Sequence, residues 1–344
     1  MKNKRVICAM SGGVDSSVAA ALLKKNGYEV VGLFISMHKN SNSFDAQKVA
    51  KKLNIPFKIL DVRKEFKKRI IDYFVKEYKK GNTPNPCVMC NKYIKFKFLI
   101  DKMTELKADF VATGHYARIK NGKLLIAKDI KKDQSYFLWT LNQKQLKKII
   151  FPLGDYTKEQ TRGLAKKFGL SVFNKKDSQE ICFIDTDLHK FLETRIVTNK
   201  GPIVTVGGKK IGEHKGLIFY TIGQRKGVEI GGIGPFYVVK KDFKNNALIV
   251  SNPPAGGRNK DLLRKEMLVK NISWISGKPY TGKCEVKIRS MAKMVSAAIN
   301  KNKVIFDKPQ RAITPGQSAV FYAPAEASAK AGKGNELLGG GIIS

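Results

Sequence analysis

Ser11-Gly12-Gly13-Val14-Asp15-Ser16-Ser17 stands between an apolar run over residues 6–10 and a helical pattern over residues 17–25. This order predicts a strand, a glycine turn and a helix start, because glycine lets backbone N–H groups approach a ligand closely. The helix N-terminus adds partial positive charge, and the serines add hydroxyl donors. Asp15 is a candidate to hold Mg²⁺ beside bound phosphates. No lysine follows the glycines, so the stretch differs from the common Gly-x-x-x-x-Gly-Lys-Ser/Thr loop.

Strand-like and helix-like segments alternate along the first half of the chain. We expect strands over residues 29–36, 57–62 and 110–113, and helices over residues 44–53, 64–80 and 91–107. This alternation predicts a parallel sheet with helices on both faces. Ligands bind at the carboxyl ends of such strands. The phosphate loop and Gly114 both follow strands, so we expect them to face one pocket.

The pattern of the chain changes after Thr198, where glycine, proline and short alternating runs replace helix signals. We therefore predict an α/β catalytic domain over residues 1–198, a small β-rich central domain over 199–258 and a C-terminal β-barrel over 259–344. Within the first domain, Asn121-Gly122 predicts a hairpin and Thr157 a capping box that opens a helix.

Composition limits the classes of protein that this chain can belong to. Its 344 residues are 42% hydrophobic, which excludes a disordered chain and predicts several domains. No apolar run is long enough to span a bilayer, and the N-terminus lacks a signal-peptide pattern, so we expect a cytoplasmic protein without a membrane partner. The formal net charge of +37 favours a polyanionic partner such as nucleic acid, although lysine scattered by compositional bias is an alternative explanation.

The five cysteines are too few and too scattered for a structural disulfide framework. Cys8 and Cys284 lie in strand-like runs and are expected in the core. Cys90 follows a loop with two prolines and precedes Lys92 and Lys95, so we expect a helix N-terminus and these lysines to lower its thiol pKa. A structural zinc site is disfavoured, because no second Cys-x-x-Cys is present.

Cys182 lies in the stretch from 175 to 184, after a polar and charged turn. By itself it is compatible with a buried residue between Ile181 and Phe183. Together with Cys90 it suggests sulfur transfer, in which one cysteine carries a persulfide and the other attacks it, leaving a disulfide.

Several motifs occur in the order found in one enzyme family. They are Ser-Gly-Gly-Val-Asp-Ser-Ser (11–17), Thr-Pro-Asn-Pro-x-x-x-Cys-Asn-Lys (83–92), Ala-Thr-Gly-His-Tyr-Ala-Arg (112–118), Lys-Asp-Gln-Ser-Tyr-Phe-Leu (132–138), Asp-Ser-x-x-Ile-Cys-Phe-Ile (177–184), Tyr-Thr-Ile-Gly-Gln-Arg-Lys-Gly (220–227) and Thr-Pro-Gly-Gln-Ser-Ala-Val-Phe-Tyr (314–322). The chain thereby resembles the tRNA-specific 2-thiouridylases of the ATP pyrophosphatase (PP-loop) superfamily, over nearly its whole length.

The resemblance implies an α/β domain like those of the adenine nucleotide alpha hydrolases and a defined reaction. ATP adenylates the position-2 carbonyl oxygen of the wobble uridine, pyrophosphate leaves, and a persulfide sulfur then displaces AMP. It also implies a persulfide donor, such as a cysteine desulfurase or a relay protein, as a partner. By the same carry-over, Cys182 bears the persulfide and Cys90 releases its sulfur. The implied ATP contacts are Ala9, Met10, Ser11, Gly12, Gly13, Val14, Asp15, Ser16, Ile35 and Gly114. The implied tRNA contacts are Asn85, Pro86, Cys87, His115, Lys132, Asp133, Gln134, Arg289 and Gln317.

The chain departs from the family pattern in three places. Cys87 stands where many members carry an aspartate, so Cys87, Cys90 and Cys182 are also candidate ligands for a [4Fe–4S] cluster that would carry the sulfur. Ser290 follows Arg289 where an Arg-Tyr pair is common, and the segment from 36 to 44 is short. Two rival functions stay open: another carbonyl-activating synthetase of the superfamily, which needs no paired thiols, and an RNA-binding protein without catalytic activity.

Overall fold

The computed structural model describes residues 4–176, 181–228, 230, 235–253, 259–324 and 335–344. The first part of the chain forms a five-stranded sheet in the order β3-β2-β1-β4-β7. Its strands are β1 (Arg5–Ala9), β2 (Glu29–Ser36), β3 (Phe57–Asp61), β4 (Phe110–Ala112) and β7 (Ile149–Ile150). All four pairings are parallel, which confirms the predicted sheet. The chain leaves β1 toward β2 and returns on its other side as β4, so the carboxyl ends of β1 and β4 flank a switch point, where such folds bind ligands.

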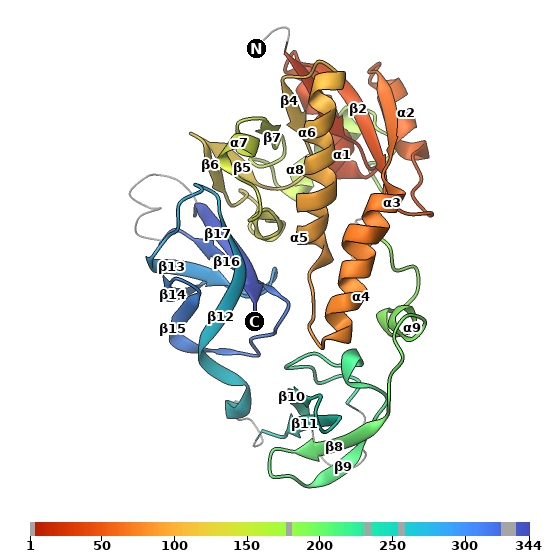
Figure 1. Cartoon of the computed structure of the whole chain (residues 1–344). Coiled ribbons are helices and arrows are strands. Elements are labelled where there is room, and N and C mark those ends of the chain that lie inside the picture. Colours follow the sequence, from red (N-terminus) through yellow and green to blue (C-terminus); the bar gives the residue numbers. More distant parts are fainter. Residues whose placement is uncertain (1–3, 177–180, 229, 231–234, 254–258, 325–334) are drawn as a thin grey trace.

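Helices cover both faces of this sheet. They include α1 (Val14–Lys25), α2 (Phe44–Lys52), α6 (Phe96–Glu105) and α8 (Lys158–Lys167), arranged around the strands in the upper part of Figure 1. The side chains of β1 alternate between two apolar clusters, with Ile7 in one and Val6 and Cys8 in the other. Successive strand residues point to opposite faces, so both faces of the sheet are buried.

Two predicted helices contain π-helical turns. The helix expected over 64–80 consists of α3 (Arg63–Phe66), η1 (Lys67–Ile71) and α4 (Asp72–Lys79). The helix expected from residue 91 begins earlier, as α5 (Pro86–Cys90), and continues through η2 (Asn91–Lys95) into α6. Proline is favourable in the first turn, and the side chain of Asn85 accepts a hydrogen bond from the backbone N–H of Cys87 at 3.2 Å. Cys90 therefore lies a turn inside the helix and not at its N-terminus, where we expected it.

The predicted hairpin and capping box are both present in the first domain. Strands β5 (Arg118–Lys120) and β6 (Lys123–Leu125) are joined by Asn121 and Gly122, both at positive φ (51° and 73°), as a two-residue hairpin turn requires. The Thr157 side chain accepts from the Gln160 backbone, and the Gln160 side chain accepts in return from the Thr157 backbone. The short elements η3 (Ser135–Phe137), α7 (Gln143–Leu146) and α9 (Leu188–Glu193) complete this part.

The central part is a four-stranded sheet in the order β10-β11-β8-β9. Its strands are β8 (Gly201–Thr205), β9 (Lys210–His214), β10 (Tyr237–Asp242) and β11 (Ala247–Ser251), with η4 (Leu217–Phe219) between β9 and β10. Alternate apolar residues of these strands are buried, including Ile203, Val238, Leu248 and Val250. In Figure 1 this sheet lies at the end of the molecule opposite the parallel sheet, near the end of α4.

After η5 (Lys260–Leu262), the last part closes into a barrel in the order β12-β15-β14-β13-β16-β17. The strands are β12 (Leu263–Trp274), β13 (Gly282–Lys287), β14 (Val295–Asn300), β15 (Lys303–Arg311), β16 (Ser318–Tyr322) and β17 (Leu337–Ile343). The barrel packs beside the α/β domain (Figure 1), where Tyr136 Oη donates to the Ser318 carbonyl at 2.9 Å and Trp139 Nε1 to Ser318 Oγ at 3.1 Å. The expected barrel is thus confirmed, and buried hydrogen bonds hold it against the α/β domain.

Candidate functional site

The loop between β1 and α1 has the geometry of an anion cradle. Gly12 has φ +76°, and a Cβ there would lie 3.0 Å from Asp45 Cβ and 3.1 Å from the Ala46 backbone nitrogen. The backbone N–H of Ser11 donates to Ser16 Oγ at 3.1 Å, which folds the loop back on the helix start. α1 begins at Val14, so the N–H groups of its first turn have no carbonyl partner within the helix and point toward the loop.

Gly114 closes the other side of this cradle, as the strand order predicted. A Cβ on Gly114 would lie 2.7 Å from the Ser16 backbone nitrogen, so only glycine allows this approach. Met10 and Ile35 are buried beside the loop, whereas Ser11 is exposed and Ala9 partly buried. The expected ATP-binding residues therefore gather at the carboxyl ends of β1, β2 and β4.

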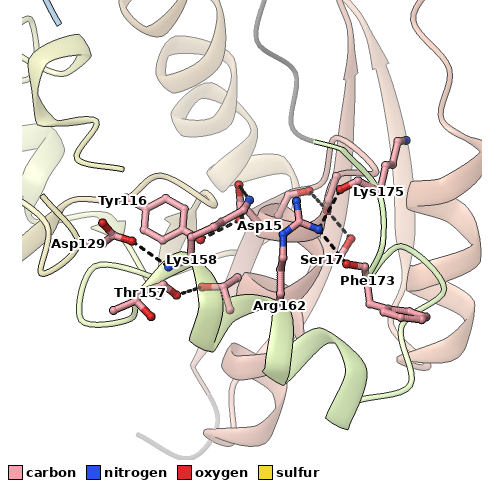
Figure 2. Close-up of polar contacts among 12 residues, drawn as sticks. Asp15, Ser17, Tyr116, Asp129, Thr157, Lys158, Arg162, Phe173 and Lys175 are labelled. Atoms are coloured by element: carbon pink, nitrogen blue, oxygen red, sulfur yellow. Dashed lines mark hydrogen bonds and ion pairs between the residues drawn. The ribbon is translucent and has the colours of Figure 1, made fainter. Parts of the chain in front are cut away.

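Asp15 is held by two residues that the sequence analysis did not single out. Lys158 Nζ lies 2.7 Å from one carboxylate oxygen of Asp15 and 2.9 Å from the other, and Tyr116 Oη donates to the same carboxylate at 2.9 Å (Figure 2). The Lys158 side chain is only 12% exposed. The capping box at Thr157 gave a signal for this residue, because it places Lys158 in the first helical position of α8. The acid of the loop is thus paired with a buried cation from α8.

Mg²⁺ has one candidate protein ligand in this loop, Asp15, and that carboxylate already contacts Lys158. Among the described residues, no group of three or more His, Cys, Asp or Glu is placed to hold a metal ion. Proteins commonly bind Mg²⁺ through one or two carboxylates together with substrate phosphates. The arrangement therefore fits a metal that arrives with the nucleotide as part of the substrate better than a resident ion.

The cysteines of the expected sulfur site come together. The charge of a thiolate at Cys182 or at Cys87 acts on Cys90, although about ninety positions separate the two segments in sequence. All five cysteines of the chain are free thiols in this structure. Cys87 and Cys182 are exposed, whereas Cys90 is buried and its Sγ lies 3.8 Å from Met37 Sδ.

The expected low pKa of Cys90 is wrong for this conformation. Burial raises the pKa of Cys90 to about 12, and Lys95 only partly opposes this effect. Desolvation also raises the pKa values of Cys87 and Cys182, with Lys95 again opposing. The error came from placing Cys90 at a helix N-terminus, where the dipole would have favoured the thiolate. In addition, the three thiols do not form a ligand group for a metal in this arrangement, and residues 177–180 of the Cys182 motif lie outside the described part.

His115 is packed between aromatic rings. Its ring stacks on Phe96 with centroids 5.8 Å apart, Phe151 meets it edge-on, and Thr113 Oγ1 shares a hydrogen bond of 2.7 Å with Nδ1. Burial lowers the pKa of His115 to about 3, with Lys95 adding to the shift. The imidazole is therefore neutral at physiological pH and offers no positive charge to a phosphate.

The Lys132-Asp133-Gln134 stretch holds the barrel as well as its own loop. Asp133 has a side chain that is 1% exposed, accepts hydrogen bonds from the backbone N–H groups of Ala127 and Ser135, and faces Lys287 of the barrel at 3.5 Å. Gln134 Oε1 accepts from the Tyr116 backbone at 3.0 Å. The Asp133 carboxylate is thus enclosed between two domains, which contradicts a direct tRNA contact by this side chain in the present conformation.

Arg289 and Gln317 also lie at domain junctions. Arg289 donates to the carbonyls of Ile222 at 3.4 Å and Ala312 at 2.7 Å, and desolvation lowers its pKa. Gln317 donates to the Thr83 carbonyl at 2.7 Å, beside Asn85 and Pro86. Arg289 thus joins the barrel to the central part, and Gln317 joins the barrel to the loop that precedes α5. The two side chains hold the domains together in this structure.

A cavity of about 1540 Å³ opens behind the cysteines. Its lining contains Met37, which contacts Cys90, and Phe183, which follows Cys182, together with eight cationic and four acidic side chains. These cations are Lys39, Arg63, Lys64, Lys67, Lys76, Lys79, Lys190 and Arg195. Arg63 and Lys67 pair with Asp61 and Asp72 of the same lining, which leaves a net excess of positive charge in the cavity. None of the helices in the described ranges is long and apolar enough to cross a membrane.

Comparisons with known proteins agree with this geometry. Residues 4–186 match the family described as the tRNA methyl transferase HUP domain, residues 189–252 its PRC-barrel domain, and residues 264–343 the aminomethyltransferase beta-barrel domain. The chain is 45% identical to the tRNA-specific 2-thiouridylase MnmA of Buchnera aphidicola, over 99% of this chain and 97% of that protein. It is 42% identical to the protein of the same name from Clostridium perfringens, over 100% of this chain and 99% of that protein. With the phosphate loop and the gathered cysteines in place, we conclude that the chain belongs to the tRNA-specific 2-thiouridylase family.

Proposed function

We propose that this protein is an ATP-dependent tRNA sulfurtransferase that converts the wobble uridine to 2-thiouridine, with a cysteine persulfide as the immediate sulfur source. The observation that carries the proposal is that Cys182 lies close enough to Cys90 and Cys87 for their charges to interact, in the same domain as the phosphate loop. Full-length similarity to proteins named for this activity supports it.

The first step uses the loop between β1 and α1. MgATP binds as substrate against the first turn of α1, and the uridine O2 attacks the α-phosphorus while pyrophosphate leaves. The N–H groups of this turn and Lys158 stabilise the charge that develops on pyrophosphate. Adenylation is needed because an amide-like carbonyl oxygen is a poor leaving group.

The second step uses the cysteines. The terminal sulfur of a Cys182 persulfide attacks C2 of the adenylated uridine, a carbon–sulfur bond forms, and AMP leaves with the former carbonyl oxygen. Cys90 then attacks the Cys182 sulfur, which breaks the sulfur–sulfur bond, leaves the thiocarbonyl on the base and forms a Cys90–Cys182 disulfide. A persulfide donor must reload Cys182 after a thiol reductant has opened the disulfide.

Cys90 is unsuited to attack while it is buried, because burial raises its pKa to about 12. We infer that the packing around Cys90 opens when tRNA is bound, and that Lys95 then stabilises the thiolate. Lys95 lies five residues after Cys90, and its charge opposes the rise in the pKa of all three thiols.

The proposed tRNA surface consists of the exposed edge at the start of α5, over residues 85–87, and the cationic side chains that line the cavity. Asn85 and Cys87 contribute the edge, whereas Pro86 is buried, and Lys132 is included because the family resemblance implies it. The affinity of this surface is expected to fall steeply with salt, because lysine and arginine contacts to phosphates release counterions. The three-domain division at residues 198 and 258 and a cytoplasmic location belong to the same proposal.

Single-cysteine variants test this function. With tRNA, ATP and a persulfide donor, Cys182→Ser and Cys90→Ser are expected to release pyrophosphate but to form no 2-thiouridine, and Cys284→Ala in the barrel is the matched control. Pyrophosphate release that survives both serine substitutions, with no 2-thiouridine formed by the wild type, would favour another carbonyl-activating synthetase. Binding of tRNA without any pyrophosphate release by the wild type would favour the non-catalytic alternative.

The cluster alternative is tested with Cys87→Asp, which restores the residue common in the family. Under the persulfide proposal, this variant and iron-free wild type both thiolate tRNA when a persulfide donor is supplied. Protein purified without oxygen that holds about four iron atoms per chain, and that loses activity when iron is removed, would establish the cluster and refute the persulfide proposal.

A further inference from the structure

The loop between α4 and α5 lies where the α/β domain, the central part and the barrel meet (Figure 1). Within this loop, the backbone N–H of Thr83 donates to the Pro315 carbonyl at 2.9 Å, and the Thr83 carbonyl accepts from Gln317 Nε2 at 2.7 Å; both partners lie just before β16 of the barrel. The Thr83 hydroxyl shares a hydrogen bond of 3.1 Å with the hydroxyl of Thr221 in the central part. All three polar groups of Thr83 are therefore bound to residues outside the α/β domain.

The residues before Thr83 are packed closely from the same two sides. A Cβ on Gly316 of the barrel would lie 2.8 Å from the Thr83 backbone nitrogen. A Cβ on Gly81 would lie 2.3 Å from the ring of Phe243, which belongs to the turn between β10 and β11. The barrel and the central part are thus both packed against residues 81–83.

A stiff connection leads from Thr83 to the thiols of α5. Two prolines restrict the backbone on either side of Asn85. Asn85 caps α5 by accepting a hydrogen bond from the backbone N–H of Cys87 at 3.2 Å, and Cys90 lies in the same short helix. A displacement of Thr83 is therefore expected to move the start of α5, because the chain between them has little freedom to absorb it.

We propose that Thr83 is a positioning residue, and that through its hydroxyl the central part sets the position of residues 84–87 and of the α5 thiols relative to the target base. The inference rests on the proposed function for the target base and for the role of Cys90. The barrel binds the backbone of Thr83, whereas the contact with the central part depends on the hydroxyl. The hydroxyl can therefore be removed while both backbone groups that bind the barrel are kept.

Loss of this hydroxyl is expected to lower a rate and to leave affinity and folding nearly unchanged. A single hydrogen bond between neutral groups contributes modestly to stability. The hydroxyl of Thr83 is bound to Thr221 and is not part of the proposed tRNA surface. Misplacement of reacting groups by about 1 Å can slow a reaction about a hundredfold. Loss of one hydrogen bond should shift the loop by less than this, so we expect a fall in rate of about tenfold.

Single-turnover thiolation tests the proposal. Protein carrying a persulfide at Cys182 is mixed with MgATP and a smaller amount of tRNA, and the rate of 2-thiouridine formation is followed over a range of protein concentrations. In Thr83→Val the maximal rate is expected to fall about tenfold, while the protein concentration that gives half of this rate changes less than about twofold. Thr83→Ser keeps the hydroxyl and is expected to restore most of the maximal rate.

Thr221→Val removes the same hydrogen bond from the central part, and it reports on this bond even if Thr83→Val fails to fold. We expect it to lower the maximal rate by the same factor, and the double variant to fall no further than either single variant, because the two residues share one interaction. Thr205→Val is the matched control, since the Thr205 hydroxyl accepts from the Lys209 backbone at 3.2 Å inside the central part. It is expected to keep the wild-type rate, and urea unfolding of every variant measures its stability.

The proposal is overturned if Thr83→Val keeps the wild-type maximal rate, or if Thr205→Val loses as much rate as Thr83→Val. A rise in the half-saturating concentration without a fall in the maximal rate would also overturn it, because the hydroxyl would then bind tRNA directly. A slow Thr83→Val beside a Thr221→Val that reacts like the wild type would refute the role of the central part. A wild type that forms no 2-thiouridine from its persulfide would instead refute the proposed function itself.

Discussion

Replacing Lys287 by methionine removes the positive charge that faces the enclosed carboxylate of Asp133. The two groups are 3.5 Å apart, with side chains 9% and 1% exposed. At an effective dielectric constant of about 20, their attraction is about 5 kcal/mol, and breaking one partner of a buried pair typically costs about 3–5 kcal/mol. Asp133 keeps its hydrogen bonds from Ala127 and Ser135, so we expect a loss near the lower limit, about 3 kcal/mol.

The chain provides its own reporter for this interface. It has two tryptophans, and Trp139 donates a hydrogen bond to Ser318 of the barrel at 3.1 Å. In a Trp274→Phe background, the fluorescence of Trp139 during urea unfolding follows the docking of the barrel. The matched control is Lys97→Met, which breaks an exposed pair with Asp101 and is expected to cost no more than about 0.5 kcal/mol.

A double-mutant cycle tests whether Asp133 acts as the partner of Lys287 or, as the family resemblance implies, as a tRNA contact. Asp133→Asn combined with Lys287→Met should be less destabilised than the sum of the two single variants, by about 1–3 kcal/mol. If Lys287→Met leaves the urea midpoint unchanged while Asp133→Asn weakens tRNA binding, then Asp133 is a tRNA contact and the buried-pair reasoning is wrong.

Three further perturbations have distinct expected results. The pKa of His115 is lowered from 6.5 to about 3, so the unfolded protein takes up a proton below pH 6.5 that the folded protein does not. The free energy of unfolding of the wild type should therefore fall by about 2 kcal/mol more than that of His115→Phe between pH 7.5 and pH 5 in urea titrations. Equal losses in the two proteins would contradict this. A Cβ on Gly114 would lie 2.7 Å from a backbone nitrogen of α1, so Gly114→Ala should weaken binding of an ATP analogue by about tenfold or more in calorimetry. Gly163→Ala is the control, because a Cβ there meets nothing within 4 Å, and it should leave the affinity unchanged. Gln317→Ala loses a 2.7 Å hydrogen bond to Thr83 and should cost about 1 kcal/mol of barrel docking in the Trp139 assay; an unchanged midpoint would show that this bond does not hold the domains.

The phosphate site was predictable from sequence because its determinants are local. Glycines and serines at fixed spacing between an apolar run and a helical pattern specify the turn with little help from the rest of the chain, and Gly12 has a positive φ, which glycine allows. The parallel sheet and the barrel were predictable for a similar reason, since periodicity of apolar residues reports which faces are buried.

The thiol chemistry of Cys90 was not predictable in the same way. The sequence gives no direct measure of burial, and a helix that begins at Pro86 instead of residue 91 moves Cys90 away from the dipole that would lower its pKa. Lys158 was likewise missed as a site residue, because its partner Asp15 lies 143 positions away.

The sequence by itself determined the family, the order of the folded parts and the composition of the nucleotide loop, since these depend on short-range patterns and motif order. Only the tertiary structure decided which polar residues are exposed and which are enclosed between domains. The family resemblance implies that Asp133 and Arg289 contact tRNA, but they lie at junctions where the barrel meets its neighbours. The physical reason is that the free energy of a charged group depends on its desolvation and on the partners that packing supplies, and both are set by segments remote in sequence.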